Sequence, residues 1–579
     1  MTFLRDNKGA QPIARLVRPG AAPYWADLVA FLLLASAAVL VFHGAEQMRQ
    51  PLAELQTVPV TLDPRNLPEY ALRTTLRMFA ALAASLLFTF TVATLAAKSR
   101  RAEIVIIPAL DILQSVPVLG FLTFTVTFFM GLFPSRQLGI ELASIFAIFT
   151  SQAWNMAFSF YQSLHTVPKD LDEVCRQFGF SPWRRFVRLE LPFAAPGLIW
   201  NTMMSMSGGW FFVVASEAIT VGNTTVTLPG IGSWLALAIE KEDFVAVGWA
   251  VAAMAVVILL YDQFIFRPVV AWADKFRFEQ TASQQRPRSW LYHLLQRTRL
   301  TRRALAVPGR LLAAIDWPAL GAPPVRLGKR AAHVVDLAWT AAIILACGAG
   351  ATVLARFIFT ALSFSDIVAA FEVGFATLAR VVVLVALASL IWVPIGVFIG
   401  LRPVWSGRVQ PIAQFLAAFP ANVLFPFVVT AIVFLQLDPN IWLSPLMILG
   451  TQWYILFNVI AGASALPTDL REAGTMFGMH GWQWWRRLVL PGIFPYYVTG
   501  ALTASGGSWN ASIVAEAVSW GDRHLEAVGL GSYIARATQA GDFPRVALGI
   551  AVMSIFVITL NRTLWRPLQL FAERRLRLD

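Results

Sequence analysis

The feature that most constrains this chain is a long internal repeat. A shift of 299 positions places Pro168 on Pro467, Asp170 on Asp469 and Gly179 on Gly478 without a gap. The same shift also places Leu171, Glu173, Trp183, Arg188, Leu191 and Pro192 on Leu470, Glu472, Trp482, Arg487, Leu490 and Pro491. So many ungapped matches indicate that the chain is a duplication, whose two halves should share one architecture.

Near the start of each half the shift is 303 rather than 299. It places Thr74, Arg77, Pro108 and Pro117 on Thr377, Arg380, Pro411 and Pro420. The difference therefore falls between Pro117 and Trp154, in the loop expected between the third and fourth spans. The tails return to 299, with Arg267 on Arg566. A duplication in one orientation predicts a pseudo-twofold axis along the membrane normal.

Composition gives the fold class. The chain is 57% hydrophobic and only 14% charged, whereas soluble domains carry about 25% charged residues. Apolar runs recur at roughly the 20-residue length that crosses a bilayer, and the alternation typical of a membrane barrel is absent from the sequence. We therefore expect an all-α polytopic membrane protein with twelve transmembrane helices in two six-helix halves. The expected spans are 25–42, 70–97, 104–130, 140–163, 194–221, 244–266, 333–359, 371–401, 409–437, 442–463, 493–520 and 543–565.

The charge pattern gives orientation and domain limits. Although the formal charge is +13, the basic residues collect in alternate inter-span loops, which argues for a membrane protein and against a nucleic-acid partner. This distribution of basic residues predicts that both termini are cytoplasmic. No cleavable small-residue site follows the basic N-terminal stretch, so we expect the first apolar run to be a retained span rather than a signal peptide. The expected domains are a first half (1–266), a basic cytoplasmic linker (267–332) and a second half (333–579). Within the linker, Leu291 to Ile315 could form an amphipathic helix on the membrane or a solvated connection.

No catalytic or metal-binding pattern stands out. The nearest approach to a phosphate-binding loop, Gly328-Lys329, is followed by Arg330 and lacks the required glycine five positions earlier. Two cysteines allow no disulfide framework, and six histidines lie scattered without ligand spacing. We therefore expect no enzyme activity, no metal and no cofactor in this chain, so that the energy for any active transport must come from a separate ATPase.

Both copies of the repeated loop resemble the EAA loop of permease subunits in binding-protein-dependent ABC importers. That pattern is Glu-Ala-Ala, three residues, Gly, and a basic-aromatic stretch ending in Leu-Pro. The second copy (466–491) reads Glu472-Ala473-Gly474 with Gly478 and Leu490-Pro491, whereas the first (164–192) is more degenerate, with Glu173-Val174-Cys175, Gly179 and Leu191-Pro192. The run Gly529 to Ile534 after Ala515-Glu516, and the tail from Arg562 to Arg577, resemble the nitrate/sulfonate/taurine branch.

The resemblance implies a type I importer permease in a bacterial inner membrane. It implies two copies of an ABC ATPase subunit that bind ATP and Mg²⁺, and an extracytoplasmic solute-binding protein. In the family the loop is a coupling helix that docks into a groove on the ATPase, which here assigns ATPase coupling to Asp170, Glu173, Gly179, Asp469, Glu472, Ala473 and Gly478. The branch implies a small anion as substrate.

Polar residues inside the spans are the candidates for a translocation pathway, because burying them in lipid is costly. Glu217 and Glu516 match across the repeat, near the outer end of the fifth span of each half, and Asn201 and Asn510 lie on the same spans. The alternative for each is hydrogen bonding between helices. A glutamate pair suits an anion poorly, unless each carboxylate is protonated or paired with a cation.

Two other classes of protein remain open from the residues alone. A secondary transporter can also have two parallel six-helix halves, but it would need ion-coupling carboxylates near the membrane midplane and no external ATPase. A membrane scaffold or receptor would carry no substrate flux. The paired loops favour the ABC permease over both.

Overall fold

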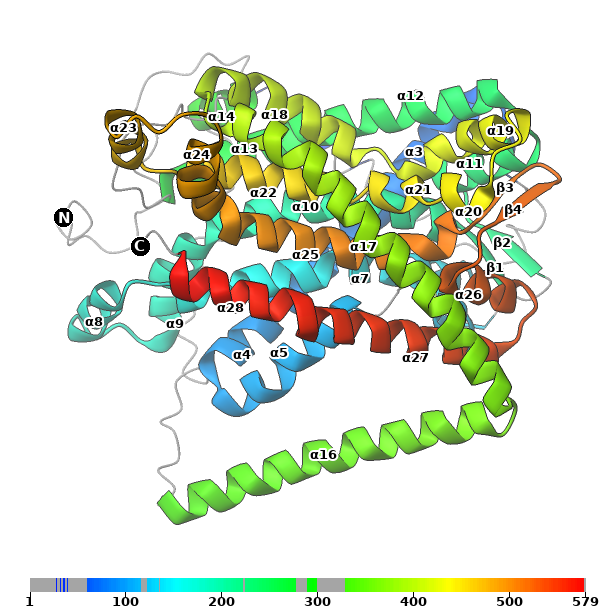
Figure 1. Ribbon diagram of the computed structural model, residues 1–579, viewed down its shortest axis with the longest axis horizontal. Helices are drawn as coiled ribbons and strands as arrows, with labels where there is room; N and C mark the ends of the chain where they lie inside the picture. The colour runs from blue at the N-terminus through cyan, green and yellow to red at the C-terminus, as the bar shows by residue number, and fades with distance from the viewer. Residues whose placement is uncertain are drawn as a thin grey trace.

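The computed structural model describes residues 60–115, 122–134, 136–221, 224–276, 289–298 and 329–576, with a few isolated positions between 28 and 39. Most of the first expected span, Pro117 and much of the linker lie outside these residues. The described chain is a bundle of long helices with two short β-hairpins (Figure 1).

The first half supplies a run of helices interrupted by one hairpin. Its elements are α3 (Leu67–Phe88), α4 (Thr94–Lys98), α5 (Arg100–Ser115), α6 (Leu122–Leu132), α7 (Gln137–His165), α8 (Lys169–Gln177), α9 (Pro182–Arg185), α10 (Leu191–Glu217), β1 (Ala218–Val221), β2 (Thr224–Thr227), α11 (Ile231–Glu240), α12 (Phe244–Tyr261) and α13 (Arg267–Ala273). In the linker, α14 (Trp290–Arg297) packs against α13.

The second half repeats the order. Its elements are α16 (Lys329–Phe359), α17 (Phe364–Gly400), α18 (Pro403–Ala418), α19 (Phe425–Phe434), α20 (Pro439–Trp442), α21 (Pro445–Leu449), α22 (Gln452–Ser464), α23 (Thr468–Met476), α24 (Gly481–Trp484), α25 (Leu490–Ala515), β3 (Ala517–Trp520), β4 (Arg523–Glu526), α26 (Leu530–Gln539), α27 (Phe543–Leu560) and α28 (Arg566–Arg575).

Length and hydropathy confirm an all-helical polytopic membrane protein. Within the described residues six helices are long and apolar enough to cross a bilayer, and eight if each of two bent helix pairs is one span. The six are Pro64–Lys98, Phe244–Ala273, Val334–Phe359, Phe364–Gly400, Gly481–Ala515 and Phe543–Ala572. The full count of twelve stays a prediction, because the first expected span lies outside the described part.

The centre of each half is built from matching helices. α7 packs against α3 and α10 in the first half, and α22 packs against α17 and α25 in the second. Trp210 on α10 and Trp509 on α25 are related by the repeat, and both are fully buried. Buried residues of the two halves join in one continuous hydrophobic core, so the halves form a single body.

The fifth span of each half is shorter than expected at its C-terminal end. The sequence predicted helix as far as Val221 and Trp520, but α10 ends at Glu217 and α25 at Ala515. Each is followed by an antiparallel hairpin, β1 with β2 and β3 with β4. In the sequence, β-branched residues flank the pair Gly222-Asn223, and such a glycine-asparagine pair is a hairpin signal. In the second half Gly521 has a φ of +55° between β3 and β4. The prediction from hydropathy alone did not use these signals.

The third span of the second half is broken at Pro420. Residues 412–418 and 421–434 form two helices bent by 79°, with Pro420 directly before the second part. Proline lacks the backbone donor that a continuous helix would need there. Pro117, the matching residue of the first half, lies outside the described chain.

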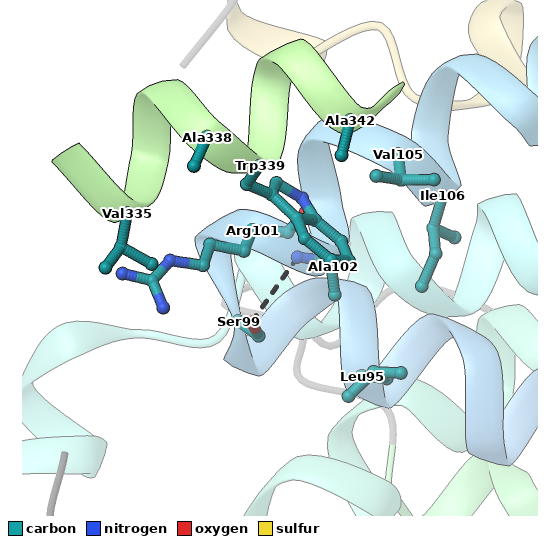
Figure 2. Close-up of a pocket in the computed structure, with 10 residues that line it drawn as sticks. All are labelled: Leu95, Ser99, Arg101, Ala102, Val105, Ile106, Val335, Ala338, Trp339 and Ala342. Atoms are coloured by element: carbon teal, nitrogen blue, oxygen red, sulfur yellow. Dashed lines mark hydrogen bonds between the residues drawn. The ribbon is translucent and has the colours of Figure 1, made fainter. Parts of the chain in front are cut away.

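The first helix of the second half stands apart from the bundle. Only 6% of its most apolar stretch is buried, and Figure 1 shows α16 running along the outside. The N-terminal part of α16 contacts the first half. There Arg101 Nε lies 2.8 Å from Asp336 Oδ1, and Trp339 Nε1 donates to the Arg101 carbonyl at 3.2 Å. Figure 2 shows the mainly aliphatic groove of about 640 Å³ between α4, α5 and α16. α16 therefore ties the two halves together at their edge.

Candidate functional site

The repeated loops project from one end of the bundle. Each begins with a short helix, α8 or α23, and Figure 1 places both at the same end, with both hairpins at the opposite end. Pro168 and Pro467 occupy the N-cap positions. Asp170 and Asp469 lie in the first turns, where a negative charge is favoured by the helix dipole.

Both loop helices end in the same Schellman motif. Gly179 and Gly478 have φ of +65° and +64°, a region that favours glycine. The Gly478 amide donates to the Thr475 carbonyl, and the next amide donates to the Gly474 carbonyl, each at 3.0 Å. Gly179 and Phe180 make the matching bonds to Arg176 and Cys175, also at 3.0 Å. These paired bonds define the motif, so both glycines are set by backbone geometry.

The tips of the loops expose apolar side chains to solvent. Phe178 is 61% exposed and its counterpart Phe477 is 81% exposed, each directly before the glycine. Met476 is 85% exposed. A Cβ atom added to either glycine would meet no atom within 4 Å. The two tips are thus open surfaces that present an aromatic ring and a bare backbone turn.

The other predicted coupling residues lie on α8 and α23 themselves. Asp170, Glu173, Asp469 and Glu472 are exposed, and Ala473 is half-buried. Cys175, at the position of Gly474, is half-buried, and burial raises the pKa of its thiol, helped by the nearby charge of Asp172. The structure therefore brings all the predicted coupling residues to the loop end of the molecule, in two separate groups.

Glu217 and Glu516 lie at the opposite end, fully enclosed by protein. Thr74 Oγ1 donates to Glu217 Oε1 at 2.7 Å, and Arg77 NH1 donates to the same oxygen at 2.7 Å. The Gly232 amide donates to the other oxygen at 2.7 Å. These bonds tie the end of α10 to α3 and to the first turn of α11.

The second half contains the same arrangement. Thr377 Oγ1 and Arg380 NH1 donate to Glu516 Oε1 at 2.8 and 3.0 Å, and the Gly531 amide donates to Oε2 at 2.8 Å. A Cβ at Gly230 or at Gly529 would lie 2.2 Å from the nearest glutamate oxygen, so glycine is required for this approach. We call each set of threonine, arginine and glutamate an outer staple: Thr74, Arg77 and Glu217, and Thr377, Arg380 and Glu516.

The two outer staples differ in how the arginine is neutralised. Arg77 also donates from Nε and NH2 to the two oxygens of Glu141, at 2.6 and 2.7 Å. Position 440, which the 299 shift matches to 141, is Asn440, whose carbonyl and Oδ1 accept from Arg380 at 3.3 and 3.4 Å. The Arg77 side chain is completely buried, whereas that of Arg380 is 13% exposed. The arginine of the first staple is therefore paired with two carboxylates, and that of the second staple with one.

This geometry bears on the pathway candidates. A glutamate near the pathway of an anion is expected to be either protonated or paired with a cation. Both glutamates are paired with an arginine, which meets the second condition. Asn201 Nδ2 donates to Ser159 Oγ at 2.7 Å, linking α10 to α7, and Asn510 Nδ2 donates to the Gly506 carbonyl at 3.4 Å. The role of these four residues in a pathway stays a prediction. The sequence analysis did not identify the arginines and threonines as partners, although their match across the repeat was the signal that could have found them.

Comparison with known proteins shows that two segments of the chain match the same protein family. The family described as "Binding-protein-dependent transport system inner membrane component" matches residues 75–266 and 392–577. The chain is 28% identical over 187 residues to the bicarbonate transport system permease protein CmpB of Synechococcus elongatus, covering 32% of this chain and 64% of that protein. It is 25% identical over 188 residues to the nitrate import permease protein NrtB of Synechocystis, covering 32% and 65%.

A more distant relative is the osmoprotectant import permease protein OsmY of Salmonella typhimurium, 27% identical over 183 residues, which cover 31% of this chain and 71% of that protein. The matched segment spans just under two thirds of the bicarbonate and nitrate relatives. Each match is about as long as one copy of the family domain, which this chain contains twice.

Proposed function

This chain belongs to the family of inner membrane components of binding-protein-dependent transport systems, and we propose that it forms by itself the translocation pathway of an ATP-driven importer. Both six-helix units of the pathway are then supplied by one polypeptide. The loop end faces the cytoplasm together with both termini, and the hairpin end faces the solute-binding protein.

The observation that carries this proposal is the pair of loop tips. Two short helices with matching Schellman ends present Phe178 and Phe477 at the same end of a duplicated permease. Exposed aromatic rings beside a bare glycine turn suit insertion into a groove on a partner, because aromatic residues dominate the binding energy of interfaces. We assign one ATPase subunit to each loop, with ATP and Mg²⁺ bound by that partner and none by this chain.

Transport then proceeds by alternating access. Closure of the two ATPase subunits on ATP moves α8 and α23, which are joined to the fifth span of their half through a second short helix, α9 or α24, and a π-helical turn. The chain's own residues transmit this movement and line the pathway; ATP hydrolysis occurs in the partner.

The proposed substrate is a small oxyanion of the nitrate or bicarbonate type. Two relatives carry these names, and the sequence resembles the nitrate/sulfonate/taurine branch. In the described residues, the arginines of both outer staples already face carboxylates, so neither contributes an unpaired positive charge to a pathway.

Reconstitution tests both parts of the proposal. The chain, its ATPase and its binding protein are placed in liposomes, and uptake of labelled nitrate, bicarbonate, taurine and glycine betaine is compared with and without internal ATP. ATP-dependent uptake of nitrate or bicarbonate is expected. Uptake driven by an ion gradient without ATP would identify a secondary transporter instead. ATP-dependent uptake of glycine betaine alone would leave the importer assignment intact but replace the substrate class.

A further inference from the structure

The two loops are attached to the membrane helices by different physical interactions. In the first half four charged side chains form a continuous chain of ion pairs from α8 to the end of α4. Arg185 Nε lies 3.1 Å from Asp172 Oδ1 and 3.4 Å from Glu190 Oε1, and Glu190 also pairs with Lys98. We call Asp172, Arg185, Glu190 and Lys98 the ionic chain.

The ionic chain connects elements that are far apart in the sequence. Asp172 lies on the loop helix α8, Arg185 ends α9, Glu190 lies in the π-helical turn before α10, and Lys98 ends α4. The Glu190 side chain is 6% exposed and that of Arg185 18%, so the middle of the chain is largely shielded. The ionic chain therefore connects α8 to the end of the second span and to the start of the fifth span through charge contacts.

The second half has no matching charge pairs at these positions. Arg471 replaces Asp172, Trp484 replaces Arg185, Val489 replaces Glu190 and Leu401 replaces Lys98 under the two repeat shifts. Val489 is completely buried, and Trp484 and Leu401 pack against the hydrophobic core. The Trp484 and Trp485 rings meet edge to face, with centroids 5.9 Å apart. Apolar side chains thus occupy three of the four positions of the ionic chain, and the fourth holds an arginine in place of the aspartate.

From this difference we propose that the ionic chain is a set of positioning residues that fixes the first loop for ATPase coupling, and that the first loop is coupled electrostatically while the second is coupled by apolar packing. The inference rests on the proposed function of the loops. Lys98 and Asp172 are partly exposed, and salt weakens interactions between partly exposed charges. Salt weakens apolar packing far less, so the two loops differ in their response to ionic strength.

The test compares Lys98→Met with Lys98→Arg in the reconstituted complex. Methionine keeps the length of the side chain and removes its charge, and arginine keeps the charge. The readout is the number of solute molecules taken up per ATP hydrolysed, measured between about 0.1 and about 1 M NaCl, over which the Debye length falls from about 10 Å to about 3 Å. Leu401→Met, at the matched position in the second half, is the control.

We expect Lys98→Met to lower this ratio at low salt by about two- to fivefold, the range for a partly exposed ion pair. Its ratio should then change little with added salt, whereas the unmodified chain and Lys98→Arg should lose efficiency as salt rises. Leu401→Met should keep the salt dependence of the unmodified chain, whatever its ratio at low salt, because it changes no charge.

Equal behaviour of Lys98→Met and Lys98→Arg at every salt concentration would overturn the electrostatic assignment. The pair Lys98→Leu with Glu190→Val, which imports the residues of the second half, gives an independent check. The number of solute molecules that this double variant takes up per ATP hydrolysed should not depend on salt. If it shows the same salt dependence as the unmodified chain, the proposal is also overturned.

Failure of the coupling function itself is detected separately. Phe477→Ala should reduce capture of the ATPase subunit by the purified chain. Undiminished capture and stimulation in that variant would remove the coupling role from the second loop, whatever the salt response of the Lys98 variants.

Discussion

The two halves share one framework but neutralise their internal charges differently. Each has a loop helix ending in a positive-φ glycine and an outer staple of threonine, arginine and glutamate. The first half adds Glu141 to its staple and joins its loop to the spans through ion pairs. The second half uses Asn440 and apolar side chains at the matched positions.

This comparison separates two kinds of requirement. The glycines and the staple glutamates fix backbone geometry, because a Cβ would clash with the glutamate or strain a left-handed turn. The residues around these fixed points differ between the halves. An arginine can be paired with a carboxylate or an amide, and an ion pair can be replaced by an apolar contact, provided that the exposure of the side chains changes to match. Arg77 with two carboxylates is fully buried, whereas Arg380 with one retains contact with solvent.

The largest expected effect concerns the two loop glycines. Gly478→Asp should abolish stimulated ATP hydrolysis and uptake while the chain still accumulates in the membrane. The change places a charge on an exposed tip and adds the strain of a left-handed conformation, about 1–2 kcal/mol for an ordinary residue and less for aspartate. ATPase activity of the reconstituted complex, with pull-down of the ATPase subunit, measures the outcome. Gly179→Asp should act in the same direction, less completely if the degenerate first loop docks more weakly.

The control for both glycine variants is asparagine at the same position. Asparagine tolerates the left-handed region as well as aspartate does but carries no charge. Gly478→Asn should therefore retain more activity than Gly478→Asp. Unchanged ATPase binding and stimulation in both aspartate variants would remove the coupling role from these loops.

The next largest effect is expected in the outer staples, where the arginine variant should be more destabilising in the first half and the glutamate variant more destabilising in the second half. Arg77→Met should destabilise the chain more than Arg380→Met, because it leaves two buried carboxylates without a cation rather than one. Glu516→Gln should destabilise more than Glu217→Gln, because Arg77 keeps Glu141 while Arg380 loses its one carboxylate among the described residues. Breaking a buried pair by removing one partner costs about 3–5 kcal/mol. Thermal unfolding of the purified chain gives the ranking.

The same variants test the pathway role of the glutamates. Glu217→Gln combined with Glu516→Gln should reduce uptake by more than it reduces accumulation in the membrane. Normal uptake by this double variant would exclude both glutamates from the pathway. Loss of accumulation in proportion to uptake would restrict them to a structural role.

The sequence predicted the helical class, the duplication and the loops, because these depend on hydropathy and on glycine and proline chemistry that local patterns express. Pro420 and Gly478 are local signals of this kind, since the chain bends at the first and the second adopts a positive φ. The hairpins were missed because an apolar, β-branched stretch satisfies a hydropathy window as well as a helix does. The arginine partners of Glu217 and Glu516 were missed because 140 and 136 residues separate the members of each pair, which spacing along the chain does not reveal.

A smaller effect is expected when Glu141 and Asn440 are exchanged one at a time. Glu141→Asn removes a buried bidentate partner from Arg77 and should lower stability by about 1–3 kcal/mol, the cost of a charged hydrogen bond lost in the interior. Asn440→Glu gives Arg380 a second carboxylate but loses the bond from Asn440 Nδ2 to Asp438 Oδ1 and sets two acids side by side. Its net effect should be near zero. Equal losses in both variants would show that burial does not explain the difference between the staples.

The smallest effect is expected from separating the halves. Expressing residues 1–285 and 286–579 as two chains should still give a working transporter, because each fragment carries its own loop and staple. The halves meet through α10 with α18 and through α5 with both α16 and α27, and these contacts do not require a covalent link. Uptake by the co-expressed fragments, normalised to their amount in the membrane, is the measurement, and each fragment alone is the control. Complete loss of uptake with both fragments in the membrane would give the linker a role beyond tethering, and α14, which packs on α13, would be the first segment to replace.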